Sequence, residues 1–179
     1  MFFRNSKKKS QKKLDELCQS VRIFIQVHFV PQRNSDPYKF NILSLKNDPD
    51  REKLQEFLAE HGNPDDFSSL CLLFLEQTGK DENYICDRSN LERGFFSKLH
   101  SDSDYRPSKP EVIALCFAMN LNIEEARVLL KSAGYALTNS SESDLIIRYF
   151  IEEKNYSLSE LDYVLKQLCD TKLEGAVAK

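Results

Sequence analysis

The stretch NLERGFFSKLHSD, residues 90–102, decides how the rest of this chain is interpreted. Its apolar residues recur at the three- and four-residue spacing of one helix face; they are Leu91, Phe95, Phe96 and Leu99. Its polar residues fall on the remaining faces; they are Arg93, Ser97, Lys98 and His100. The spacing therefore predicts a helix with one buried side and one side open to a partner.

The residues before this helix favour a helix-turn-helix. A helix is expected over DENYICDRS, 81–89, and a following helix over LERGFFSKL, 91–99. Cys86 supplies the small side chain needed where the two helices cross. Asn90 tolerates the left-handed backbone of a tight turn, and Leu91 then fills the core. In such a unit the second of the two helices presents its N-terminal half outward.

Helix-start signals recur through the rest of the chain. Asn63-Pro64 predicts a helix to about Gln77, ended by Gly79. Each of four later helices begins at Ser or Asn with an acid three residues on; the pairs are Ser108 and Glu111, Asn122 and Glu125, Ser141 and Asp144, and Ser157 and Glu160. An all-helical structure is therefore expected for 63–168.

The first sixty residues follow a different pattern. Residues 21–30, VRIFIQVHFV, alternate apolar and polar side chains and are dominated by β-branched residues, which predicts a strand. A second strand is expected over 38–45 and a helix over 48–62. The sequence thus predicts a small α/β segment at 14–62. The exposed edge of the 21–30 strand is a candidate surface for pairing with a second copy of the chain.

Charge is distributed unevenly. The segment 1–13 contains six basic residues and no acid, and is expected to be a flexible arm that contacts phosphates; the bases are Arg4, Lys7, Lys8, Lys9, Lys12 and Lys13. A solvated terminus without a partner is the alternative. Since the whole chain carries −3 and this segment +6, residues 14–179 carry −9.

Composition excludes several classes of protein. Hydrophobic residues make up 41% and charged residues 30% of the 179 positions, as in a soluble folded protein, and no apolar run is long enough for a membrane span. The basic N-terminus lacks the apolar run of a secretory signal, so a cytoplasmic location is expected. The five cysteines are odd in number and form no C-x-x-C pair, which predicts free thiols and no zinc site.

The linked motifs F-S-K, Y-x-P-S-K and A-G-Y-x-L, followed by a D-L-I-I-x-Y-F-I helix, resemble a bacterial variety of the lambda-repressor-type helix-turn-helix domain. The resemblance covers about 65–168. It implies a mainly α, lambda-repressor-like fold. We expect a helix-turn-helix domain at 63–138, a two-helix extension at 139–170 and a tail at 171–179. It also implies a DNA-binding regulator of transcription.

The resemblance carries roles onto particular residues. Glu92, Arg93, Ser97 and Lys98 would face the major groove, where Arg93 could bind a guanine edge. Tyr105, Arg106 and Lys109 would hold phosphates.

Three features weigh against DNA binding and keep a second function open. Asp81 and Glu82 stand where repressors usually carry a neutral polar residue, and Glu92 would repel phosphate. The segment 80–109 holds six bases and six acids, so it offers little electrostatic affinity for DNA. The alternative is a non-enzymatic adaptor that binds a protein partner through the same fold. Self-association through the C-terminal helices is also open.

No catalytic constellation is recognisable. The three histidines lie in unrelated contexts, and glycine-rich phosphate loops, G-x-S-x-G and H-E-x-x-H motifs are missing. The carboxylates of SDSD, 101–104, lack the glycine and distal glutamate of a calcium loop. The sequence therefore predicts a binding protein without cofactor or metal rather than an enzyme.

Overall fold

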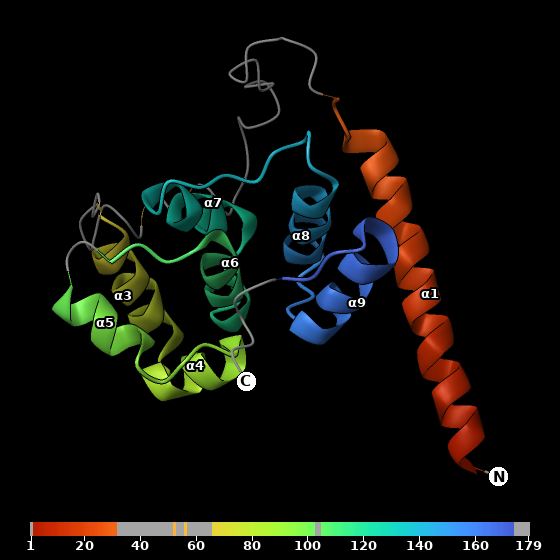
Figure 1. Ribbon diagram of the computed structural model, residues 1–179, viewed down its shortest axis with the longest axis horizontal. Helices are drawn as coiled ribbons and strands as arrows, with labels where there is room; N and C mark the ends of the chain where they lie inside the picture. Colours follow the sequence, from red (N-terminus) through yellow and green to blue (C-terminus); the bar gives the residue numbers. More distant parts are fainter. Residues whose placement is uncertain (1, 32–51, 53–55, 57–65, 103–104, 174–179) are drawn as a thin grey trace. The chain divides into compact units, whose positions relative to one another are not determined.

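A computed structural model of the chain describes residues 2–31, 52, 56, 66–102 and 105–173 (Figure 1). These residues form eight helices and no strand. They divide into two compact units, one built from 1–31 with 137–174 and the other containing 32–136. The expectation of a mainly α protein is confirmed. The strand expected over 38–45 and nearly all of the helix expected over 48–62 lie outside the described residues.

The first unit joins the two ends of the chain. Helix α1 (Phe2–His28) packs against α8 (Glu142–Glu152) and α9 (Leu158–Cys169), which pack on each other. Figure 1 shows α1 as one long helix running beside this pair. Just beyond α1, the Val30 amide donates to the Asn139 carbonyl at 2.9 Å. The helices α8 and α9 are the two expected in 139–170.

The strand predicted over 21–30 is wrong, because residues 2–28 form one helix. Its inward residues follow a helical spacing, and the outward ones lie between them. Val21 and Ile25 are 0% and 9% exposed, whereas Ile23 and Val27 are 54% and 72% exposed. A strand would have put all four side chains on one face. The strand edge offered as a pairing surface therefore does not exist.

The basic segment 1–13 is likewise not a flexible arm, since residues 2–13 belong to α1. No proline or glycine interrupts residues 1–30, so nothing in the sequence ends the helix earlier. Contacts with α9 hold its first half. The Lys13 ammonium lies 3.0 Å from a Glu160 carboxylate oxygen, and the Gln11 amide donates to the Tyr163 hydroxyl at 2.7 Å.

The second unit surrounds one buried helix. It consists of α3 (Phe67–Thr78), α4 (Glu82–Ser89), α5 (Phe95–Ser101), α6 (Lys109–Ala118) and α7 (Ile123–Ser132). Residues 112–118 of α6 are all buried, and α6 packs against both α4 and α7. A helix that is apolar on all its sides is stable in a water-soluble protein only where other helices surround it. The buried helix α6 therefore supports α4, which packs against it.

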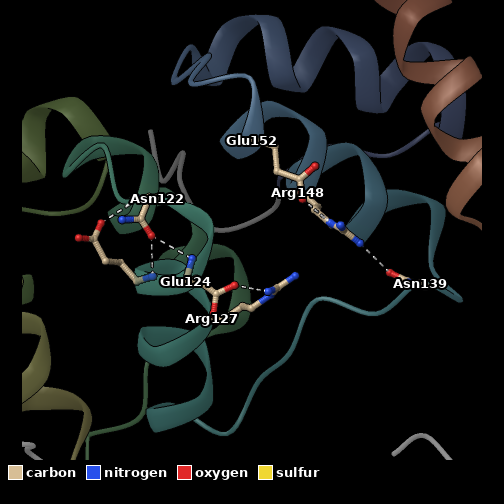
Figure 2. A network of polar contacts seen from close by, with 7 residues as sticks. Asn122, Glu124, Arg127, Asn139, Arg148 and Glu152 are labelled. Carbon is tan, nitrogen blue, oxygen red and sulfur yellow. Dashed lines mark hydrogen bonds and ion pairs between the residues drawn. The ribbon is translucent and has the colours of Figure 1, made fainter. Parts of the chain in front are cut away.

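The predicted capping residues start the later helices. At α7, the Asn122 side chain accepts from the Glu125 amide at 3.0 Å, and Glu125 accepts from the Asn122 amide at 2.8 Å. Figure 2 shows this cap together with the Glu124–Arg127 ion pair beside it. Ser141 and Ser157 accept from amides three residues on at α8 and α9. The helix predicted to start at Asn63-Pro64 is α3, but it begins at Phe67 with an extended Asp66 as its N-cap, so the predicted start is wrong.

A polar network ties α8 to its own unit. The Arg148 guanidinium donates to Glu152 at 2.7 Å and to the Asn139 side chain at 3.4 Å (Figure 2). The same guanidinium lies over the Phe24 ring of α1, 5.8 Å from the ring centre. Arg148 therefore joins α8, α1 and the segment before α8.

Candidate nucleic-acid interface

The connection from α4 to α5 is a turn centred on Asn90. Asn90 has φ 56° and ψ 25°, a left-handed conformation that asparagine adopts more readily than most residues. The amides of Asn90 and Leu91 both donate to the Cys86 carbonyl, which closes the end of α4. Ser89 is fully buried and donates its hydroxyl to the Ile85 carbonyl at 2.7 Å. These are the positions at which the sequence predicted a helix-turn-helix turn.

The second helix of this pair begins later than expected. Leu91 and Glu92 belong to no regular element, Arg93 and Gly94 form a turn, and α5 starts at Phe95 with Gly94 as its N-cap. The Phe95 amide donates to the Glu92 carbonyl, three residues earlier. The α-helical pattern, in which an amide donates to the carbonyl four residues earlier, begins with the Lys98 amide and the Gly94 carbonyl. The predicted start at Leu91 is therefore wrong by four residues. Glycine favours a helix end over a helix interior, which accounts for the shift.

The buried and exposed sides of this segment divide as the sequence predicted. All four apolar residues are buried; they are Leu91, Phe95, Phe96 and Leu99. The four residues expected to face DNA are exposed; they are Glu92, Arg93, Ser97 and Lys98. The turn and the start of α5 thus expose these four polar side chains to solvent, while the apolar side chains between them are buried.

Each of the two basic residues among them has an acidic neighbour. The Arg93 guanidinium lies 3.8 Å from an Asp87 oxygen of α4, and the Lys98 ammonium pairs with Glu92. All four side chains are more than half exposed, at 79% and 66% for the first pair and 52% and 58% for the second. The surface is therefore polar but close to neutral.

Three further contacts involve residues of α4 or α5. The His100 ring nitrogen lies 2.8 Å from a Glu82 oxygen, which links α5 to the start of α4. The Lys80 ammonium lies over the exposed Tyr84 ring at 5.4 Å. The Arg88 guanidinium donates to the Asn120 side chain at 2.6 Å, which joins α4 to the turn after α6. Sequence reasoning assigned no role to Asp87 or Arg88.

The loop residues expected to hold phosphates lie in different surroundings. The half-buried Tyr105 ring meets the Phe95 ring edge-on at 5.8 Å, and burial, with Glu111 and Glu92 nearby, raises the Tyr105 pKa. The Arg106 guanidinium is exposed and donates to the Tyr105 carbonyl at 3.1 Å. Lys109 opens α6 and is half-buried. Tyr105 therefore lies beside α5, with Arg106 next to it in the chain.

The basic residues at the start of α1 belong to the other unit. Lys13 pairs with Glu160, and Lys12 lies 3.7 Å from Glu16 on the same helix. The side chains of Arg4, Lys7, Lys8 and Lys9 lie outside the described residues.

Three of the five cysteines are core residues. All five are free, and Cys71, Cys86 and Cys116 are buried in the second unit. Burial raises the pKa of the Cys71 thiol to about 12, and it also raises the pKa of Cys116. Such thiols stay protonated and are poor nucleophiles or metal ligands. Within the part of the chain that the structure describes, no three His, Cys, Asp or Glu residues gather to hold a metal ion.

Comparison with models of protein families, with curated proteins and with solved structures finds no match to this chain. Among the helices described here, none combines the length and apolar character needed to cross a bilayer.

Proposed function

We propose that this chain is a non-enzymatic, sequence-specific DNA-binding protein that acts in the regulation of transcription. The observation that carries the proposal is the left-handed Asn90 turn between α4 and α5, followed by four exposed polar side chains over a buried apolar base. A helix-turn-helix uses the same arrangement to bring the start of its second helix to the major groove.

The chemistry of these side chains suits DNA. An arginine such as Arg93 offers paired donors that match O6 and N7 of guanine, and Ser97 can bond either to a base edge or to a phosphate. Lys98 adds a cation at the same surface. Arg106 and Lys109, which follow α5, are placed in this proposal on the phosphate backbone, where they would fix orientation rather than sequence.

The ion pairs do not prevent such binding. Pairs between side chains this exposed are worth only about 0–1 kcal/mol. A good contact between arginine and guanine discriminates by about 1–3 kcal/mol. DNA can therefore replace Asp87 as the partner of Arg93 at small cost.

The test is binding of labelled duplex fragments, followed by fluorescence anisotropy at about 50 mM and about 200 mM salt. The double variant Arg93→Ala/Lys98→Ala should raise the Kd about 100-fold, because it removes two contacts of the reading surface. Lys131→Ala/Lys172→Ala removes the same charge from exposed positions outside α4 and α5 and serves as the matched control. Equal losses in both variants would contradict a role for α5.

A second test separates sequence reading from attraction of the basic segment for phosphates. The variant Lys7→Gln/Lys8→Gln/Lys9→Gln keeps good helix formers in α1 while removing three charges. Under the proposal this variant still prefers one duplex sequence over another. If it loses all binding while Arg93→Ala/Lys98→Ala loses none, the contact is non-specific and made by α1.

An adaptor that holds a protein partner is the second candidate, and the neutral charge of the α4–α5 surface favours it. Asp87 and Glu92 offset Arg93 and Lys98, and Tyr84 exposes 43% of its surface nearby in the chain. Interfaces between proteins are enriched in tyrosine and depleted of charged residues at their core. Failure of the wild-type protein to bind any duplex at about 50 mM salt would favour this candidate.

A further inference from the structure

The two carboxylates on the reading surface are spaced in the same way from their basic partners. Asp87 precedes Arg93 by six residues and Glu92 precedes Lys98 by six. Within one straight helix, side chains meet at spacings of three or four. Both pairs are therefore products of the turn at 90–94, which folds the chain so that each acid reaches its base.

We propose that Asp87 and Glu92 are specificity-determining residues that suppress binding to DNA in general. The inference rests on the proposed function and deepens it. Each carboxylate occupies a basic group that would otherwise attract any phosphate. The surface then favours a duplex whose base edges replace the carboxylates over one that offers only its phosphates.

The groups that can displace these carboxylates from their basic partners limit which DNA sequence the surface would bind. An acceptor that displaces Asp87 from Arg93 must offer hydrogen-bond acceptors where the carboxylate oxygens lie. Guanine does so in the major groove with O6 and N7, and its partner cytosine offers an amino donor to a carboxylate such as Glu92. A duplex containing a G·C pair at this position is therefore the preferred ligand. A phosphate backbone supplies the acceptors for Arg93 but repels Glu92.

The test compares Glu92→Gln and Asp87→Asn with the wild-type protein. Each variant should bind random-sequence duplex about tenfold tighter, since it removes both a competing partner and a repelled charge. The slope of log K against log salt should steepen by about one for each charge removed. Selected G·C-containing duplex should gain less, so the ratio of specific to non-specific affinity should fall.

Two controls distinguish the effect of the two ion pairs on DNA affinity from the effect of the protein's net charge. Glu76→Gln makes the same charge change at an exposed position of α3 and should leave both affinities within about twofold of wild type. Introducing Glu92→Gln into Lys98→Ala should give a much smaller gain, because the ammonium that Glu92 occupies is gone. An unchanged gain would mean that Glu92 acts through bulk charge alone and would overturn the proposal.

The outcomes separate the inference from the function on which it rests. Wild-type binding with no change in Glu92→Gln or Asp87→Asn overturns the inference and leaves DNA binding intact. A lack of binding by the wild-type protein and by both variants at about 50 mM salt overturns both. Because the four side chains are largely exposed, their substitution does not disturb the core, and circular dichroism verifies this.

Discussion

At the scale of single residues, the account depends on the backbone of Asn90. An L-residue without a polar side chain holds a left-handed conformation at a cost of about 1–2 kcal/mol, and Asn90 has φ 56°. Asn90→Ala should therefore lower the free energy of unfolding by about 1 kcal/mol. Asn90→Gly should change it by less, because glycine accepts positive φ. Urea unfolding followed by circular dichroism measures both; equal losses would show that the side chain rather than the backbone matters.

The ion pairs of the reading surface illustrate which residue-scale features the sequence did not reveal. The buried set and the exposed set of 90–102 follow from spacing alone, and the structure has them as predicted. Which acids pair with Arg93 and Lys98 depends on the length of the turn before α5. The sequence alone does not specify that length. The sequence places Glu92 at the major groove and as a charge that repels phosphate, but it shows neither its pairing with Lys98 nor any role for Asp87.

At the scale of elements, the sequence predicted the polar caps at which α6, α7, α8 and α9 begin, but it did not predict α1. Val21 and Ile25 fit a two-residue period and a helical period equally well, so the alternation through Phe29 predicts a strand where the structure has a helix. The decisive signal lies upstream. Leu14, Leu17 and Cys18 continue the three- and four-residue spacing of the inward face towards the N-terminus of the helix. These positions do not show the two-residue alternation of a strand.

The packing of α1 provides a direct test of this correction. Val21→Ala should lower the stability of the first unit by about 2 kcal/mol, because Val21 is fully buried. Ile23→Ala should change it by less than about 0.5 kcal/mol, because Ile23 is 54% exposed and lies on the other side of the helix. The measurement is the unfolding transition in urea. Equal effects at the two positions would support a strand, in which they share a face.

The contact between α1 and α9 should depend on pH. Hydrogen bonds from Asn155 and from Lys13 hold the pKa of Glu160 below its ordinary value. A carboxyl with a lowered folded pKa stabilises above its unfolded pKa, and the contribution is lost as the pH falls through the folded pKa. Glu160→Gln should therefore reduce stability at neutral pH, by at most about 1 kcal/mol because Lys13 is exposed.

The same difference should shrink towards acidic pH, where the wild-type carboxyl also becomes neutral. Thermal unfolding of both proteins across the acidic range measures it. Glu153→Gln, at an exposed position after α8, should show no such dependence. A stability difference for Glu160→Gln that stays constant with pH would contradict the role of its charge.

At the scale of the whole molecule, the order of segments along the chain does not match the two units. Residues 1–31 complete a unit with 137–174, although more than a hundred residues separate them. Local signals predicted α8 and α9 as an extension, but pairing with a distant helix leaves no local signal. The expectation of a separate N-terminal segment failed for this reason as well as for the mistaken strand.

The charge of the whole chain also bears on the proposed function. A net charge of −3 gives DNA no general attraction to this protein. Any affinity must come from a local surface, and the α4–α5 surface is itself nearly neutral. The proposal therefore predicts weak non-specific binding together with a marked preference for one sequence.

Binding of duplex DNA at the turn and the first residues of α5 can be observed through amide chemical shifts during a titration with duplex. Amides within 90–102 and 105–109 should shift at about 50 mM salt, while the amide signals of α8 and α9 should not move. The Arg93→Ala/Lys98→Ala protein should show no shifts at the same duplex concentration. Shifts confined to α1, or no shifts at saturating duplex, would show that α5 does not bind DNA.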